Sequence, residues 1–230
     1  PNLSSQIQGG WHFPKAHHSL DPDLILEKLY QSFLSRGGQF QKEEVSSIHP
    51  RDDSTQVNNN EYNQVVICTG AFSKSLVKKI EGQFIPLETE RGYHIEFIEK
   101  QKLLSRPTSL VESGMYLTPL HNRLRAVGTV ELGGLHSEIS QARIDYIARD
   151  AKRLLPSLQD YQNPWLGYRP TMPDCLPVLG RSPKFKNIFY AFGHNHLGWT
   201  LGPTTGKLIA DLICHGREIN SVYSIDRYLS

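Results

Sequence analysis

The sequence predicts an α/β fold, and three segments support this prediction. Val65–Gly70 is a continuous apolar run that ends in Thr-Gly, as in a strand buried on both faces of a sheet. Asn187–Phe192 has the same character, and apolar residues at helical spacing predict a helix over Thr200–Cys214. Between these segments, alternating residues predict an antiparallel-rich sheet with strands at Glu90–Phe97, Gly114–Pro119 and Arg123–Val130.

Shorter signals define the other expected elements. Asp21-Pro22 begins a helix, because Asp accepts backbone N–H bonds at the N-cap and Pro fits the first turn, and Gly37-Gly38 ends it. Apolar residues also share one face of a predicted helix over Ser140–Leu155. The remaining expectations are short strands at Gly9–Phe13 and Gln39–Ser47, and a hairpin that joins Thr55–Val57 to Tyr62–Thr69.

Composition limits the kind of protein. The 230 residues are 38% hydrophobic and 21% charged, which fits a globular chain with a real core. The net charge of +2 comes without a basic run, so no nucleic-acid partner is expected. No run approaches the ~20 apolar residues of a membrane span, and no signal peptide is visible. Three cysteines without ligand spacing indicate a reducing, cytoplasmic compartment and neither a disulfide framework nor a zinc site.

The loop Gly193–Thr200 (GHNHLGWT) is the first candidate site. It joins a predicted strand to a predicted helix, and its two glycines allow the backbone to approach a flat ligand closely. The positive end of the helix would then stabilise negative charge on that ligand. The alternative is structural, with glycines that only form the turn and Trp199 as a core residue.

Arg169 is the second candidate. It is flanked by apolar residues and prolines in Gly167–Asp174 (GYRPTMPD), which is unlike an ordinary solvated surface. A planar guanidinium binds a carboxylate through two parallel hydrogen bonds, a geometry that Lys cannot supply. The alternative is a structural ion pair between Arg169 and Asp174.

Histidines and tyrosines supply further candidates. His194 and His196 form an H-x-H pair of a kind that binds zinc or iron, but no partner segment has ligand spacing, and so no metal site is predicted. Tyr93, His94 and Tyr116 lie in the alternating strands. They are either core or interface residues, or polar groups that line a small-molecule pocket.

In combination, five segments resemble the C-terminal part of an FAD-dependent D-amino-acid dehydrogenase, in the superfamily that includes glycine oxidase, sarcosine oxidase and D-amino-acid oxidase. The resemblance runs from about Gly9 to Gly216, and its segments are Val65–Ser73, Glu90–Phe97, Arg123–Gly134, Trp165–Gly180 and Gly193–Thr200. Their order is specific to the superfamily and less specific for the substrate.

The resemblance implies roles for individual residues. Arg169 would hold the substrate carboxylate, and the other catalytic or substrate-side residues would be Tyr116, His196 and Tyr93, with either Tyr93 or His94 facing the pocket. The residues that would bind FAD are Val45, Thr69, Gly70, His194, Asn195, His196, Leu197, Gly198, Trp199 and Thr200. Close relatives usually have small residues at positions 195 and 196, so a narrower or differently polar pocket is expected.

The resemblance also implies two interleaved domains. Residues 19–82 and 163–230 would form an incomplete FAD-binding, glutathione-reductase-like layered domain. Residues 1–18 and 83–162 would form an α+β substrate domain with an antiparallel-rich sheet. The G-x-G-x-x-G unit that cradles the FAD pyrophosphate is absent from these 230 residues, so a missing N-terminal segment would supply it. The chain alone is therefore expected to bind FAD weakly and to be inactive.

For the complete, bacterial enzyme of amino-acid catabolism, the resemblance implies oxidation of a D-amino acid by hydride transfer to FAD, giving a 2-oxo acid and ammonia. Two alternatives stay open: a glycine- or sarcosine-type amine oxidase on the same scaffold, and a non-catalytic binding module without its flavin half. Family members of the dehydrogenase type commonly pass electrons to membrane quinones. Peripheral attachment at the inner membrane is thus a second option beside a purely cytoplasmic location.

Overall fold

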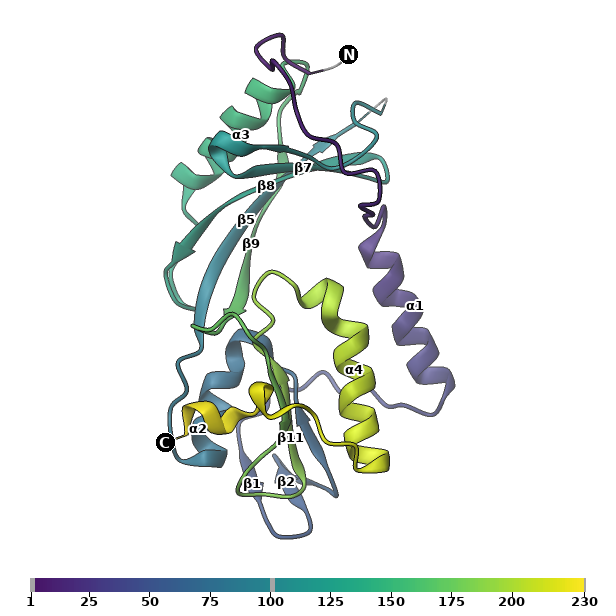
Figure 1. Ribbon diagram of the computed structural model, residues 1–230, viewed down its shortest axis with the longest axis vertical. Helices are drawn as coiled ribbons and strands as arrows, with labels where there is room; N and C mark the ends of the chain where they lie inside the picture. Colours follow the sequence, from purple (N-terminus) through teal and green to yellow (C-terminus); the bar gives the residue numbers. More distant parts are fainter. Residues whose placement is uncertain (1–2, 100–101, 230) are drawn as a thin grey trace. The chain divides into compact units, whose positions relative to one another are not determined.

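The structure is a computed structural model that describes residues 3–99 and 102–229, and its chain divides into two compact units (Figure 1). The first unit comprises Pro1–Lys42, Gly92–Glu131 and Glu138–Gly167, and the second comprises Glu43–Arg91, Leu132–Ser137 and Tyr168–Ser230. The sequence-based division differs from these units, because it groups residues 19–42 and 163–167 with the second unit and residues 83–91 and 132–137 with the first. The assignment of one unit to FAD and the other to substrate stays a prediction.

A five-stranded, antiparallel-rich sheet dominates the first unit. Its order is β6-β7-β8-β5-β9, and both β6/β7 and β7/β8 are antiparallel pairs. The strands are β5 (Glu88–Ile98), β6 (Thr108–Leu110), β7 (Met115–Leu120), β8 (Arg123–Leu132) and β9 (Gln162–Thr171), and a short 3-10 helix covers Val111–Ser113. Strands β5 and β9 each continue past a boundary into residues of the second unit.

Helix α3 (Gln141–Leu154) packs against this sheet and closes the core of the first unit (Figure 1). Ile144, Ile147 and Ala151 recur at helical spacing and are fully buried, as the sequence predicts. They meet Tyr93 and Ile95, which share one side of β5 because alternate residues of a strand face the same way.

Helix α1 (Pro22–Ser35) also forms as predicted, with the Asp21 carboxylate accepting the Leu24 N–H at 2.9 Å as the N-cap. However, none of its residues is buried. Leu29, for example, is 63% exposed. The helix therefore presents an apolar surface that the described residues leave uncovered.

The second unit contains two small sheets and two helices. Strands β1 (Ile48–Pro50), β2 (Thr55–Val57) and β3 (Asn60–Tyr62) form one antiparallel sheet. In the other sheet, β11 (Ile188–Phe192) lies between β10 (Val178–Arg181) and β4 (Val65–Ile67), antiparallel to the first and parallel to the second. Helix α2 (Ser73–Glu81) contacts β1, and α4 (Gly198–His215) contacts β10 and β11 (Figure 1). Short 3-10 helices cover Gly70–Phe72, Ser221–Tyr223 and Ile225–Tyr228.

The predicted strand at Gln39–Ser47 is wrong: this segment has no regular secondary structure. Asn58 explains why. Its Oδ1 accepts the N–H groups of Ser46 and Ser47 at 3.0 and 3.2 Å, and its Nδ2 donates to the Glu44 carbonyl at 2.8 Å. A side chain thus bonds backbone groups that a strand would pair with a neighbour.

Two further predictions need correction. Gly9–Phe13 is not a strand, and Trp11 within it is 95% exposed. The predicted hairpin is shorter than expected, because β2 pairs with β3 across an Asn58-Asn59 turn in which Asn58 has a φ of 52°. The Val65–Thr69 segment contributes β4 to the other sheet instead.

None of the helices within residues 3–99 and 102–229 is long and apolar enough to cross a membrane.

Candidate functional site

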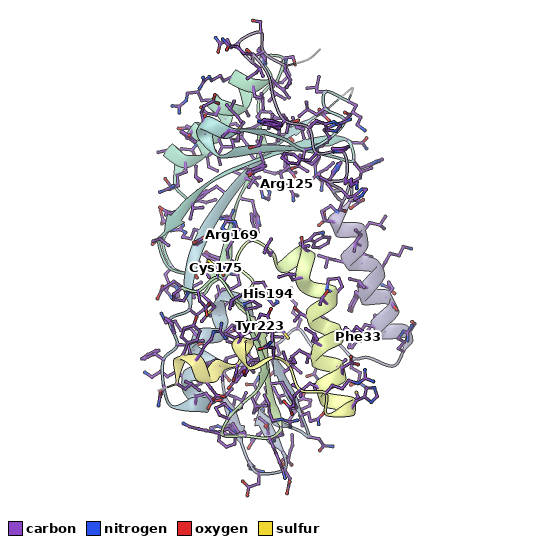
Figure 2. All side chains as sticks on the ribbon, viewed as in Figure 1. Phe33, Arg125, Arg169, Cys175, His194 and Tyr223 are labelled. Carbon is purple, nitrogen blue, oxygen red and sulfur yellow. The ribbon has the colours of Figure 1, made fainter. Side chains whose placement is uncertain are left out.

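Arg169 lies near the end of β9 with a half-buried side chain (Figure 2). Its Nη1 atom is buried and has no hydrogen-bond partner among the described residues. Burial lowers the pKa of the guanidinium, and the Glu90 carboxylate partly opposes this shift. A half-buried cation without a bonded partner is costly for the folded state, and an incoming anion would relieve that cost.

The alternative reading of Arg169, an ion pair with Asp174, does not form. Asp174 instead accepts a hydrogen bond from Nε of Arg227 at 2.8 Å and one from the Leu176 N–H at 3.0 Å. Within the described part of the chain, Arg169 has no carboxylate partner in an ion pair. The described residues therefore leave the Arg169 guanidinium without an anionic partner.

The loop Gly193–Thr200 is fastened to the strand end that carries Arg169. The Asn195 N–H donates to the Pro170 carbonyl at 3.0 Å, and Asn195 Oδ1 accepts the Met172 N–H at 3.1 Å. Both bonds depend on tight backbone geometry, because Asn195 has a φ of 51° and Gly193 one of 84°. A Cβ on Gly193 would lie 2.9 Å from Cγ of Met172, which only glycine avoids.

The two histidines of this loop have different partners. His194 is half-buried and its Nε2 lies 2.9 Å from Thr205 Oγ1 on α4, while burial lowers its pKa (Figure 2). His196 Nε2 lies 2.9 Å from Glu90 Oε2. In the parts of the chain that the structure describes, no group of three or more His, Cys, Asp or Glu residues could hold a metal ion.

The loop and the start of α4 have features that fit a flavin. Leu197 at the N-cap offers no side-chain hydrogen bond, so no side chain occupies the N–H groups of the first turn. Trp199 is 51% exposed, which rules out the alternative that it is a core residue. Backbone donors next to an exposed flat side chain suit an anionic, planar ligand.

The other predicted FAD residues lie in the same unit. Thr69 and Gly70 directly follow β4, and Thr69 Oγ1 lies 2.9 Å from Ser73 Oγ. Gly70 has a φ of 56°, and open space surrounds the position of a Cβ on it. Val45 is half-buried against the core of this unit. Residues just beyond the carboxyl end of a strand in an α/β sheet are where such folds bind dinucleotides.

The remaining predicted residues lie in the first unit. Tyr93 is fully buried in the core beneath α3, and its hydroxyl donates to Glu131 Oε2 at 2.5 Å. His94 points to the opposite side of β5 and stacks on Trp165, with ring centroids 4.8 Å apart. Burial, and next the charge of Arg125, lower the pKa of His94 to about 4. Tyr116 is 52% exposed on β7, so the accessible side chains are those of His94 and Tyr116.

Glu90 is not among the residues predicted from the sequence, although it is the partner of His196. A signal was available. In β5, alternation sets Glu90, His94 and Glu96 on the side opposite Tyr93 and Ile95, so that three polar side chains share a side of one strand. Thr205, the partner of His194, gave no comparable signal because it lies in the apolar sequence of α4.

Comparison with known proteins identifies the family. A family model described as FAD dependent oxidoreductase matches residues 1–212. The chain belongs to this family. Among its relatives in the family, it is 30% identical over 224 residues to a D-amino-acid oxidase of Bradyrhizobium diazoefficiens, covering 93% of this chain and 53% of that protein. A D-amino acid dehydrogenase of Neisseria gonorrhoeae is 29% identical over 222 residues, covering 92% and 52%.

Solved structures of other proteins have a similar fold. Glycine oxidase from Geobacillus kaustophilus superposes with a TM-score of 0.79 at 26% identity, over 91% of this chain and 58% of that one. L-proline dehydrogenase from P. horikoshii superposes with a TM-score of 0.77 at 19% identity, over 89% and 59%, a similarity of fold alone. The chain thus spans just over half the length of the relatives and structures that it matches.

Proposed function

We propose that the complete protein oxidises a D-amino acid with FAD as the electron acceptor, giving a 2-oxo acid and ammonia. The family assignment supports an FAD-dependent oxidoreductase, and D-amino-acid oxidase and dehydrogenase are among the similar relatives. The observation that carries the proposal is Arg169, which lies beside the loop predicted to bind the flavin. Its half-buried guanidinium has no bonded partner among residues 3–99 and 102–229.

Each group has one task in this proposal. Arg169 binds the substrate α-carboxylate through two parallel hydrogen bonds. FAD, when bound, supplies the acceptor for the hydride that leaves Cα. The chain holds FAD through Val45, Thr69, Gly70 and the loop residues 194–200.

Orientation is the main contribution of Arg169. A carboxylate fixed at two oxygens leaves the substrate little freedom to rotate, so its Cα–H is presented in one direction. His194 supports the loop through Thr205, and Asn195 ties that loop to the strand end beside Arg169. The carboxylate anchor and the flavin-binding loop therefore keep a fixed mutual position within the second unit.

A glycine- or sarcosine-type oxidase is the second candidate. The similarity to glycine oxidase from Geobacillus kaustophilus, at a TM-score of 0.79 and 26% identity, favours it. Both functions would use FAD as the first electron acceptor, and they differ in the substrate and in whether O2 reoxidises the flavin. Peroxide formed with O2 and glycine, and absent with D-alanine, would select the second candidate.

The proposal is tested with Arg169→Ala and Arg169→Lys in the complete protein. Loss of the guanidinium removes charge-assisted hydrogen bonds worth about 1.5–3 kcal/mol, so KM for a D-amino acid should rise roughly 10- to 100-fold. Lys restores the charge without the fork and should recover only part of this loss. The FAD absorbance per protein should stay unchanged. An unchanged KM in Arg169→Ala would contradict the proposal.

A further inference from the structure

One carboxylate oxygen of Glu90 forms a hydrogen bond, and the other has no hydrogen bond to the described residues. It lies on β5, which neighbours the strand of Arg169, β9, and its side chain is 24% exposed. Oε2 bonds to His196 Nε2 at 2.9 Å. Oε1 takes no hydrogen bond from the residues that the structure describes, and it is not among their buried, unpartnered atoms.

Glu90 and Arg169 carry opposite charges but form no ion pair with each other. Arg169 lies on the strand next to that of Glu90, and the Glu90 charge partly opposes the lowering of the guanidinium pKa, yet the hydrogen bond of Glu90 is with His196. A direct pair would satisfy both groups, as Asp174 and Arg227 do at 2.8 Å. Because Glu90 is bonded to His196, the Arg169 guanidinium and the Glu90 carboxylate remain two separate groups of opposite charge.

We propose that Glu90 binds the α-ammonium group of the substrate while Arg169 binds its α-carboxylate, with His196 positioning Glu90. The inference rests on the proposed function and adds a determinant of substrate class to it. The α-ammonium and α-carboxylate groups of an amino acid are attached to the same carbon. Two neighbouring side chains of opposite charge can therefore bind both groups at once. A carboxylate accepts strong hydrogen bonds from an ammonium group and none from a methyl group.

The three residues belong to the second unit, so their arrangement does not depend on any contact with the first. Glu90 would thereby distinguish amino acids from carboxylic acids that have the same shape but no ammonium group. A site with a polar group built for a substrate N–H discriminates strongly against an analogue without it. Glu90 would thus select for the ammonium group of the substrate, independently of the recognition of the carboxylate by Arg169.

Two ligands of equal shape test the proposal: 2-aminoisobutyrate and pivalate. They differ only in an ammonium group replaced by methyl, and neither has a Cα–H to lose. Dissociation constants are measured by calorimetry on the complete, FAD-loaded protein. The wild type should bind 2-aminoisobutyrate more tightly, and Glu90→Gln should weaken that binding about tenfold or more while leaving pivalate unchanged. Pivalate binding also shows that the Glu90→Gln variant is folded.

Two further variants assign the roles. Arg169→Ala should weaken both ligands, because both carry the carboxylate. His196→Ala, compared at equal FAD content, should weaken 2-aminoisobutyrate more than pivalate, and His196→Gln, which keeps a donor for Glu90, should restore part of the loss.

The outcomes separate the two proposals. Pivalate binding that depends on Arg169, together with an unchanged ligand preference in Glu90→Gln, would overturn the role of Glu90 and leave the proposed function standing. Pivalate binding that is absent from the wild type, or unaffected by Arg169→Ala, would instead count against the proposed function. A wild type without any preference for 2-aminoisobutyrate would also overturn the inference.

Discussion

Arg123 and Arg125 share the Glu96 carboxylate at 3.0 and 2.9 Å, and Arg227 binds Asp174 at 2.8 Å. Arg169 differs from these arginines because, among the described residues, it has no carboxylate in an ion pair although it is half-buried. A protein interior tolerates such an arrangement mainly where function requires it. Glu90, on the neighbouring strand, is likewise bonded to His196 and not to an arginine.

The Asp174–Arg227 pair predicts how stability depends on pH. Burial alone would raise the Asp174 pKa, but hydrogen bonds from Arg227 and from the Leu176 N–H outweigh it and hold the pKa at about 2, below its ordinary 3.8. A lowered folded-state pKa gives stability that is present above the unfolded pKa and is lost as the pH falls from about 4 to about 2. Urea unfolding across this range should therefore show a shallower loss of stability for Asp174→Asn than for wild type.

Asp160→Asn is the matched control for this pH prediction. Asp160 is fully exposed and lies 3.5 Å from Lys152, so its ion pair should contribute little. The control should keep the pH slope of the wild type. An Asp174→Asn slope equal to that of wild type would show that the Arg227 contact does not stabilise the fold.

Arg169 could be predicted as a site residue from the sequence because it is a charged residue among prolines and apolar residues. Glu90 stands in a strand with ordinary alternation, and its importance depends on a contact with His196, more than 100 residues away. A contact of this kind is set by the tertiary fold and leaves no local pattern. Local pattern likewise left open whether Tyr93 or His94 is accessible, until α3 was seen to cover Tyr93.

Helices α3 and α4 and strands β4 and β11 carry clear apolar patterns, and all four form as predicted. Helix α2 was not predicted, although Leu76, Val77 and Ile80 lie at helical spacing and are buried. At nine residues, α2 is shorter than the window over which helical periodicity is normally recognised. Strand β9 was not predicted either, since Pro164 and Pro170 lie within it and proline normally argues against a strand.

Two glycines of the β11–α4 region should respond oppositely to alanine. Gly193→Ala forces a left-handed residue against Met172 and should destabilise the protein by roughly 1–3 kcal/mol. Gly206→Ala lies inside α4 with open space around it and should stabilise by up to about 1 kcal/mol. The free energy of unfolding in urea gives both values. A neutral Gly193→Ala would mean that the loop is not constrained by the end of β9.

The chain spans just over half the length of its relatives. Along α1 no residue is buried, and in the other unit Trp199 and Leu197 at the start of α4 are both more than half exposed. Apolar side chains exposed together on one helix are typical of a surface that another segment covers. The family resemblance predicts that such a segment brings the phosphate-binding turn.

This leads to a prediction for the 230-residue polypeptide by itself. Its residues include no G-x-G-x-x-G unit, so it should take up little FAD and show no turnover. Titration with FAD, followed by flavin fluorescence, measures the affinity, and the complete protein is the reference. A stoichiometric yellow complex of the isolated polypeptide would contradict the expected need for the additional unit.

The most direct test of the central claim is a crystal structure of the complete, FAD-loaded protein with pivalate bound. We expect both carboxylate oxygens within hydrogen-bond distance of the Arg169 guanidinium, next to the loop Gly193–Thr200. A carboxylate bound elsewhere, with Arg169 turned to solvent, would contradict the assignment of Arg169 as the substrate anchor.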